Sequence, residues 1–302
     1  MSVSTSRCLL FADDLKLYSA VSGLDDCKAI QNDINAIVAW SEANLLHFNE
    51  SKCKVITFTR VRQPLTFNYT INDNRIERVD KIKDLGLLLD SRLDFRQHII
   101  STCESASKIL GFVIRVCSTF DSCRVALTLY KAYVRSRLEY NALVWDPYQS
   151  IYSLGIERIQ KKFARYLYKR MYGYYPYLYP SMFITGMVGL NTLEYRRKLL
   201  LLVHYYHLLI NKVDNPTTLE QVGLACIPAR FLVGAESADG PRRCRRMFAA
   251  PRGVRTHRGA AAPTARAVAL LNAMHAQHAD LDLFHDKPRH IYNVIKLFLD
   301  SL

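Results

Sequence analysis

Phe11-Ala12-Asp13-Asp14 decides the fold of this chain, because it sets two adjacent carboxylates between two short apolar runs. The runs are Cys8-Leu9-Leu10 on one side and Leu15-Lys16-Leu17-Tyr18 on the other. An acidic turn between two such runs predicts a β-hairpin with Asp13 and Asp14 at its tip. Adjacent carboxylates repel each other, and a divalent cation such as Mg²⁺ is one reason to hold them together. The alternative is a solvated turn, since aspartate is a common turn residue.

The composition is that of a globular protein with a strong basic excess. The chain has 302 residues, of which 50% are hydrophobic, so it can bury a sizeable core in one large domain or two. Lys and Arg number 41 against 27 Asp and Glu, which gives a net charge of +14. Such an excess favours anionic partners, either polymers or membrane surfaces, although a basic surface kept for solubility has the same composition.

Eight cysteines are scattered along the chain, and no two of them are spaced as Cys-x-x-Cys. Without such a pair, or a Cys/His cluster of zinc-finger spacing, the sequence predicts free thiols in a reducing compartment. The N-terminus has no apolar signal segment, and the most apolar later run, 199–210, is shorter than the roughly 20 residues that span a bilayer. We therefore expect a soluble intracellular protein, nuclear or cytoplasmic, that is neither secreted nor inserted in a membrane.

The N-terminal third carries both helix and strand signals. A helix is predicted from Leu24, and its inward positions recur at helical spacing. These positions are Ile30, Ile34, Ile37 and Trp40. Strands are predicted over 54–59, 65–71 and 85–89, and Gly86 in the last run suggests a bulge or the close approach of another backbone. Lys52 lies in the turn before the first of these strands. A hairpin, a helix and further strands indicate an α+β fold.

From residue 94 the apolar period becomes helical. Three amphipathic helices are predicted, over 94–113, 121–138 and 151–170, the second with Asp121 as its N-cap. Each has a basic side, which is either a solvated face or part of a clamp over a phosphate backbone. A Tyr/Pro-rich connector at 172–179 is expected to pack a helix junction rather than to stack on bases.

The last third changes character along its length. A helix over 192–211 is apolar nearly all round, so we expect it to be buried or partnered. The stretch after it is rich in Arg, Gly, Pro and Ala and lacks periodicity, which is typical of a basic arm that binds nucleic acid. Two short helices are predicted at the end of the chain, over 265–278 and 291–302.

The order of these segments resembles the reverse transcriptases of non-LTR retrotransposons, in particular the jockey-like elements of insects. The stretch from Phe11 to Tyr18 is similar to the catalytic palm hairpin, and Lys83-Asp84-Leu85-Gly86 is similar to the primer-grip region. Further residues that match in order are Trp40, Asn44, Leu46, Asn49, Ser51, Lys52, Cys53, Leu89, Asp90, Leu110, Gly111, Phe112, Leu129, Tyr130, Val134, Arg135, Ser136, Leu138, Glu139, Tyr140, Trp145, Asp146 and Pro147. The tail from Met247 to Phe284 resembles the ends of these polyproteins, so the resemblance covers essentially the whole chain.

This resemblance implies an α+β fold in which a truncated polymerase palm is followed by a mostly α-helical thumb and C-terminal region. The palm would contribute a hairpin, a helix and antiparallel strands. The implied parts are the end of the palm at 1–92, the thumb at 93–172, a connector with an apolar helix at 173–228, and an arginine-rich arm with terminal helices at 229–302.

The resemblance also implies RNA-templated DNA synthesis with Mg²⁺ as cofactor, in which Asp13 and Asp14 are catalytic residues and metal ligands. Lys52 would donate a proton to the departing pyrophosphate or stabilise its charge, and Leu85 and Gly86 would lie near the primer. The implied partners are an RNA template, a DNA primer and deoxynucleoside triphosphates. Residues expected to bind nucleic acid through phosphate contacts are Lys131, Arg135, Arg158, Lys161, Lys162, Arg165, Arg242, Arg243, Arg245 and Arg246.

The chain also departs from the pattern of that family. Ten residues precede Phe11, so the fingers, most of the palm and the third metal-binding carboxylate would be missing. Two carboxylates alone make a weak Mg²⁺ site, so we expect this chain to depend on the missing part and not to polymerise by itself. Two alternatives stay open: a non-catalytic module that binds RNA or DNA, and a non-functional remnant of an element.

Overall fold

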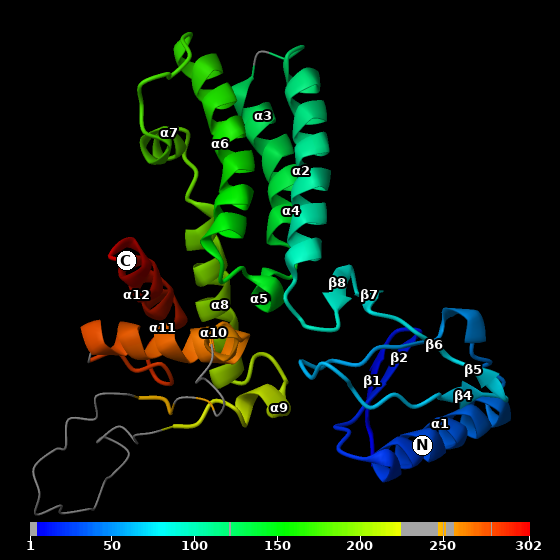
Figure 1. The fold of residues 1–302 in the computed structure, drawn as a ribbon. Coiled ribbons are helices and arrows are strands. Elements are labelled where there is room, and N and C mark those ends of the chain that lie inside the picture. The colour runs from blue at the N-terminus through cyan, green and yellow to red at the C-terminus, as the bar shows by residue number, and fades with distance from the viewer. Residues whose placement is uncertain (1–4, 121, 225–246, 250, 252–256, 279) are drawn as a thin grey trace, which may run out of the picture. The chain divides into compact units, whose positions relative to one another are not determined.

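The computed structural model describes residues 5–120, 122–224, 247–249, 251, 257–278 and 280–302. The chain divides into two compact units, Met1–His98 (unit 1) and Ile99–Leu302 (unit 2). In the described ranges, unit 1 holds all the named strands and unit 2 is built from helices (Figure 1). This mixture agrees with the predicted α+β class, while the finer division into palm, thumb, connector and arm stays a prediction.

Unit 1 contains one long helix and short strands that pair two by two within its described residues. Its elements are β1 (Arg7–Phe11), β2 (Asp14–Tyr18), α1 (Leu24–Ala43), the 3₁₀ turn η1 (Glu50–Lys52), β3 (Lys54–Val55), β4 (Thr70–Ile71), β5 (Asn74–Arg75), β6 (Glu77–Arg78), β7 (Lys81–Asp84) and β8 (Leu87–Asp90). The pairs β1–β2, β4–β5 and β7–β8 are antiparallel hairpins, whereas β3 and β6 run parallel. The prediction of antiparallel strands is therefore wrong for β3 and β6, because the intervening β4–β5 hairpin returns the chain in its original direction.

The strands predicted over 54–59 and 65–71 are much shorter than expected, since each pairs over two residues, at β3 and β4. Arg78 accounts for part of the difference. Its guanidinium donates to the backbone carbonyl of Phe67 at 2.7 Å and to the hydroxyl of Thr57. The segments around Thr57 and Phe67 are thus held by the side chain of Arg78 instead of by hydrogen bonds to a neighbouring strand. Backbone polar groups need a hydrogen-bond partner, and either kind can supply it.

Helix α1 confirms the helix predicted from Leu24, and of its predicted inward positions Ile37 is buried while Ile30 and Ile34 are half-buried. The buried positions are Cys27, Asp33, Ile37 and Ser41. Trp40, predicted to point inward, is 37% exposed. Trp40 lies at the edge of this face, since successive residues of a helix are 100° apart. Asp33 belongs to the buried face, where its carboxylate accepts hydrogen bonds from the backbone N–H of Thr5 at 3.3 Å and of Ser6 at 2.8 Å. A buried charge needs such donors, so this side of α1 faces the segment that leads into β1.

Unit 2 is a set of long helices joined by short ones. Its elements are α2 (Arg96–Cys117), α3 (Cys123–Leu129), the π-helical turn η2 (Tyr130–Arg135), α4 (Ser136–Glu139), α5 (Ala142–Trp145), α6 (Ser150–Tyr172), α7 (Ser181–Met187), α8 (Leu193–Leu209), α9 (Pro216–Leu219), α10 (His257–Ala260), α11 (Pro263–Gln277) and α12 (Pro288–Asp300). The first residues of α2 belong to unit 1. Helices α2, α3–α4 and α6 lie side by side (Figure 1).

The middle helix of this group differs from the single helix predicted over 121–138. It begins after Ser122, whose hydroxyl caps the backbone N–H of Val125, and the predicted cap Asp121 lies outside the described residues. A π-helical turn then interrupts it at Tyr130–Arg135. The ring of Tyr130 stacks on Phe163 of α6 with centroids 4.1 Å apart, and both rings are fully buried. The stacked pair joins α6 to the irregular helix.

The second half of unit 2 packs α8 against α11 and α12. Helix α8 confirms the predicted helix over 192–211, and Leu201, Leu202 and Tyr206 are among the buried side chains of its core. The two helices predicted at the end of the chain are α11 and α12. The burial of α8 on several sides follows from its nearly continuous apolar sequence.

Asp146 connects the first half of unit 2, α2 to α6, with the second half, which contains α8 and α11. Its carboxylate accepts a hydrogen bond from Nε of Arg197 on α8 at 2.5 Å and pairs with Nη1 of Arg266 on α11. Arg197 is almost fully buried, with 2% of its side chain exposed, and Arg266 also donates to the carbonyl of Leu143 at 2.8 Å. One carboxylate therefore pairs with two guanidinium groups in a site where unpaired charge is costly.

We predict that Asp146→Asn destabilises unit 2 by about 3–5 kcal/mol, because it leaves two largely buried guanidinium groups without their counter-charge. The free energy of unfolding in urea measures this. Lys198→Gln is the control, since the Lys198–Glu194 pair is exposed and its loss should cost at most about 1 kcal/mol. Equal effects of the two variants would show that Asp146 has no special structural role.

Candidate functional site

The predicted catalytic hairpin is confirmed as a hairpin. Phe11 pairs with Asp14, so the turn consists of Ala12 and Asp13 alone, and both aspartates are exposed at the tip. Ala12 has a φ of 49°, a left-handed conformation that costs a residue other than glycine on the order of 1–3 kcal/mol. The strained turn therefore exposes the two consecutive residues Asp13 and Asp14 to solvent.

The Leu85-Gly86 segment forms a second hairpin turn, and the predicted bulge at Gly86 is wrong. Leu85 joins β7 to β8 with a φ of 44°, and Gly86 follows with a φ of 82°. Positive φ at both central residues is the pattern of a type I′ turn, which suits the twist of a two-residue hairpin and favours glycine. The antiparallel pairing of β7 with β8 thus places the glycine at a chain reversal.

An ion pair joins the two hairpins within unit 1. Nζ of Lys16 on β2 lies 2.7 Å from a carboxylate oxygen of Asp84 on β7. Lys16 is two residues beyond Asp14, and Asp84 directly precedes Leu85. The structure thereby brings together the two segments that the sequence relates to the metal hairpin and the primer grip.

Lys52 is exposed at the end of η1, and its backbone N–H donates to the carbonyl of Asn49 at 3.0 Å. No hydrogen bond or ion pair among the described residues joins Lys52 to Asp13 or Asp14. Its predicted role at the departing pyrophosphate therefore stays a prediction.

The two aspartates do not amount to a complete metal site. In the part of the chain that the structure describes, no group of three or more His, Cys, Asp or Glu side chains is placed to hold a metal ion. Mg²⁺ needs near-octahedral oxygen ligands, and two exposed carboxylates from one turn supply few of them. The side chains present thus do not fit a resident Mg²⁺ ion without further ligands.

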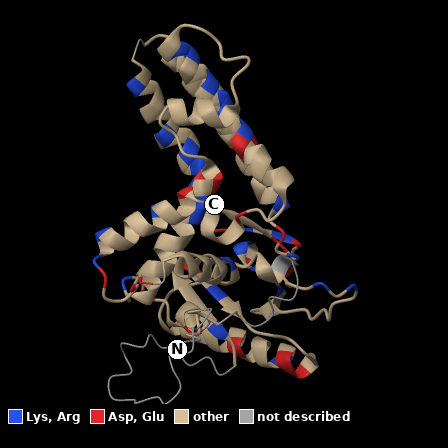
Figure 2. Ribbon diagram, turned by 90° about the vertical axis from the view of Figure 1, so that its left-hand side faces the viewer, with Lys and Arg blue, Asp and Glu red and all other residues tan. Residues whose placement is uncertain are grey.

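The ten predicted nucleic-acid residues are exposed, half-buried or outside the described residues. On α6, Arg158 and Lys162 are exposed, and Lys161 is half-buried, as is Lys131 in η2. Lys and Arg recur along the long helices of unit 2 (Figure 2). The predicted residues of the arginine-rich arm lie outside the described residues. They are Arg242, Arg243, Arg245 and Arg246.

Arg135 and Arg165, by contrast, are engaged within the protein. Arg135 lies 3.8 Å from the carboxylate of Glu139, which also pairs with Arg196 of α8. Burial, together with the positive charge of Arg196, lowers the pKa of Arg135. Arg165 donates to the carbonyl of Pro176 at 2.7 Å. Both guanidinium groups thus have structural partners besides any phosphate.

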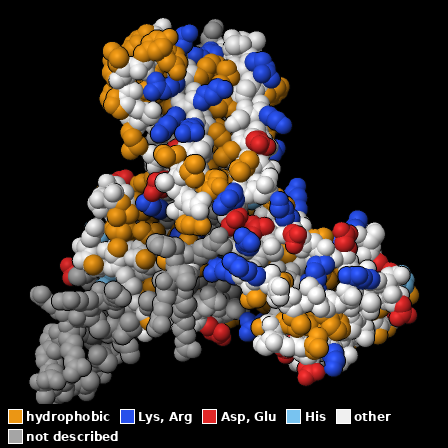
Figure 3. All heavy atoms as spheres, viewed as in Figure 1, with side chains coloured by type: hydrophobic (Ala, Val, Ile, Leu, Met, Phe, Trp, Pro, Cys, Tyr) orange, Lys and Arg blue, Asp and Glu red, His pale blue; other side chains and the backbone are white. Residues whose placement is uncertain are grey.

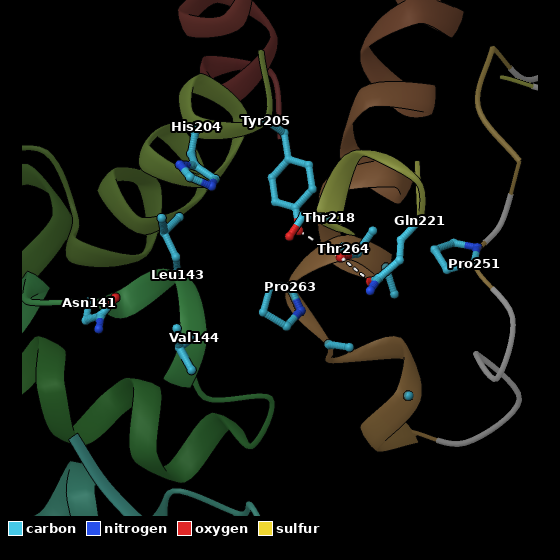
Figure 4. A pocket seen from close by; sticks show the side chains of 13 residues that line it. Asn141, Leu143, Val144, His204, Tyr205, Thr218, Gln221, Pro251, Pro263 and Thr264 are labelled. Atoms are coloured by element: carbon cyan, nitrogen blue, oxygen red, sulfur yellow. Dashed lines mark hydrogen bonds between the residues drawn. The ribbon is translucent and has the colours of Figure 1, made fainter. Parts of the chain in front are cut away.

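Unit 2 also contains a cavity of about 500 Å³ that the sequence does not predict. Figure 4 shows Tyr205, Thr264 and Gln221 along one side, where the hydroxyls of Tyr205 and Thr264 are 2.9 Å apart and Thr264 donates to Gln221 at 3.3 Å. His204 lies on another side, and burial lowers its pKa. None of the residues predicted to act in catalysis or binding lines this cavity, so it is separate from the hairpin site.

The six cysteines within the described residues are free thiols, as the sequence predicts; Cys226 and Cys244 lie outside them. Among the helices described, none combines the length and the apolar character needed to cross a membrane.

Comparison with known proteins gives one partial similarity. The RNA-directed DNA polymerase from mobile element jockey of Drosophila funebris is 30% identical over 92 residues, which is 30% of this chain and 10% of that protein. No family model matches the chain, and no solved structure matches it. The similarity supports a reverse-transcriptase-like relationship over part of the chain, and the chain spans about one tenth of the relative that it matches.

We predict that protonation of His98 loosens the β7–β8 hairpin. The backbone N–H of Leu88 donates to Nδ1 of His98 at 3.3 Å, and burial lowers the pKa of this histidine below its ordinary 6.5. A depressed folded-state pKa gives stability that is present above pH 6.5 and lost as the pH falls below it. Hydrogen exchange of β7 and β8, corrected for the intrinsic rate, should lose more protection between pH 7.5 and 5 in the wild type than in His98→Gln.

His47 provides the control for this measurement, since it is exposed in the same unit. His47→Gln should keep the full pH dependence of the wild type. An unchanged pH dependence in His98→Gln would exclude His98 as the titrating group.

Proposed function

We propose that this chain is part of an RNA-directed DNA polymerase related to that of jockey elements, and that the chain alone binds nucleic acid without polymerising. The observation that carries the proposal is the exposed Asp13-Asp14 turn of the β1–β2 hairpin, joined through Lys16 and Asp84 to the Leu85-Gly86 turn. The partial similarity to the jockey polymerase supports the same relationship.

In the intact polymerase, Asp13 and Asp14 would supply two of the carboxylates for Mg²⁺, and the remaining carboxylate would come from another part of the polymerase. Lys52 would serve the departing pyrophosphate of the incoming deoxynucleoside triphosphate. The exposed turn at Leu85 and Gly86 would face the primer backbone, where a glycine permits close approach.

The binding of template and primer would rest on unit 2. Arg158 and Lys162 stand one helical turn apart on the exposed side of α6. No acidic residue occurs between Glu157 and Glu194, so this side of the helix has no local carboxylate competitor in its own segment. Lysine and arginine side chains on such a surface bind phosphates by releasing counter-ions.

A non-catalytic binding module is the second candidate. It is favoured by the incomplete set of metal ligands in the part of the chain described, since binding through phosphates requires no metal. A polymerase part could regain DNA synthesis when the missing part is supplied, whereas a binding module could not. Both candidates require that the purified chain binds nucleic acid.

We predict that the purified chain binds an RNA–DNA hybrid with strong salt dependence, and that Arg158→Glu/Lys162→Glu weakens this binding. Fluorescence anisotropy at several salt concentrations measures both. Loss of two phosphate contacts should reduce the slope of log K against log salt by about 1.8. Lys28→Glu/Lys81→Glu in unit 1 changes the net charge equally and should leave the slope near the wild-type value. A chain that fails to bind at low salt contradicts the proposal.

We further predict no primer extension on an RNA template when the chain is supplied with Mg²⁺ and all four deoxynucleoside triphosphates, because two carboxylates make too weak a metal site. Gel electrophoresis of a labelled primer measures this. Extension that disappears in Asp13→Asn would establish instead that the chain is a polymerase by itself.

A further inference from the structure

The end of α6 and the connector to α7 form an unusually aromatic surface. Tyrosine occupies seven of the fourteen positions from 166 to 179: Tyr166, Tyr168, Tyr172, Tyr174, Tyr175, Tyr177 and Tyr179. The segment between Glu157 and Glu194 carries no Asp or Glu but contains Arg158, Lys161, Lys162, Arg165, Lys169 and Arg170. Tyrosines and positive charge are thus concentrated together. We call the exposed part, Tyr172 to Phe183, the tyrosine platform.

The platform is anchored to the core through Tyr168. This residue is 3% exposed, and its hydroxyl lies 2.7 Å from that of Tyr174. Its ring is 4.4 Å from the ring of Tyr172 and 6.1 Å from that of Tyr179. A buried tyrosine therefore fixes three neighbours that are themselves partly exposed.

Further contacts fix the remaining rings. Tyr179 stacks on Phe183 of α7 with centroids 5.5 Å apart and planes 26° apart, and Tyr175 contacts Tyr177 at 4.6 Å. The guanidinium of Arg165 lies 6.0 Å from the ring centroid of Tyr175, in addition to its hydrogen bond to Pro176. Rings held in this way lose little further freedom when a ligand binds.

Several side chains of the platform are more exposed than packing alone requires. Tyr177 is 81% exposed, Leu178 96%, Met182 69% and Phe183 48%. Figure 3 shows hydrophobic side chains, tyrosines included, gathered over α7 and the connector, with Lys and Arg side chains nearby on α6. An exposed patch of this kind marks a surface that another molecule covers. Packing at a helix junction, the favoured expectation for this connector, therefore accounts for Tyr168 but not for the exposure of Tyr177 or Phe183.

The charge and shape of the surface indicate which molecule this is. Flat exposed rings offer stacking faces, and the basic side chains of the same acid-free segment attract phosphate. Unpaired nucleotides match both features, whereas the bases of a duplex are already stacked on each other. Stacking on an aromatic side chain contributes about 1–3 kcal/mol per base in proteins that bind single strands.

We propose that the tyrosine platform binds a single-stranded segment of RNA or DNA by stacking its bases on Tyr177 and Phe183, beside the phosphate contacts of α6. The proposal rests on the proposed nucleic-acid binding and adds a second mode to it.

The test compares full-length chain with Tyr177→Ala/Phe183→Ala in binding a labelled 15-nucleotide single strand. We expect affinity to fall about 5- to 150-fold for each stacked base lost. Tyr177→Phe/Phe183→Tyr keeps both rings and should bind like the wild type. Leu178→Ala removes an exposed apolar side chain without a ring and should also leave binding unchanged. Thermal unfolding checks that each variant is folded.

Two further probes separate this proposal from its alternatives. A strand of the same length with abasic sites has the same charge and should bind the wild type as weakly as the normal strand binds the Ala variant. The RNA–DNA hybrid should bind wild type and Ala variant equally. Equal affinity for normal and abasic strands would overturn the platform. A second result would also overturn it: the Ala variant keeps its affinity for the single strand but loses self-association, or loses binding to phosphatidylserine vesicles, that the wild type shows.

The two proposals can fail separately. If the hybrid binds through α6 and the single strand is indifferent to the two rings, the platform is wrong and the proposed function stands. If the chain binds neither hybrid nor single strand, the proposed nucleic-acid binding fails, and the platform with it.

Discussion

The half-buried carboxylate of Asp146 is the constraint on which unit 2 depends. It follows α5 directly and faces guanidinium groups from α8 and α11, which are far apart in the sequence. A charged group in such a place is stable only with its partners present. The turn at Trp145-Asp146-Pro147, which reads in the sequence as the end of a helix, is therefore also the point where the two halves of unit 2 meet. That arrangement fixes the α6–α8 framework from which the basic side chains and the tyrosine platform project.

The contacts that hold the hairpins of unit 1 together are much weaker. Its strands pair two by two in the described residues, and an ion pair at a partly exposed site joins its two longer hairpins. Partly exposed ion pairs contribute about 0.2–1 kcal/mol, so the relation of Asp13-Asp14 to Leu85-Gly86 is weakly held within this chain. A site whose geometry must be exact for metal chemistry needs more support than this, which agrees with the proposal that polymerisation requires further protein.

Basic residues of unit 2 differ in what they can bind. Arg158 and Lys162 are exposed, whereas Arg165 is committed to Pro176 and Tyr175, and Arg135 to Glu139. All four belong to the same sequence class, and charge alone predicts the same role for each. Their difference comes from neighbours contributed by other elements. The tyrosines divide in the same way, because Tyr168 is an anchor and Tyr177 a free face.

The sequence by itself determined the elements whose signals are local. The Asp13-Asp14 hairpin, α1, α6, α8 and the two last helices follow from turn residues and apolar period, which act within a few residues. Only the tertiary structure decided the parallel β3–β6 pair and the exposure of Trp40. It also decided which arginines are engaged and the network of Asp146, Arg197 and Arg266. Those features depend on groups distant in the chain, since a buried charge or an unpaired backbone group takes whichever partner the fold brings within reach.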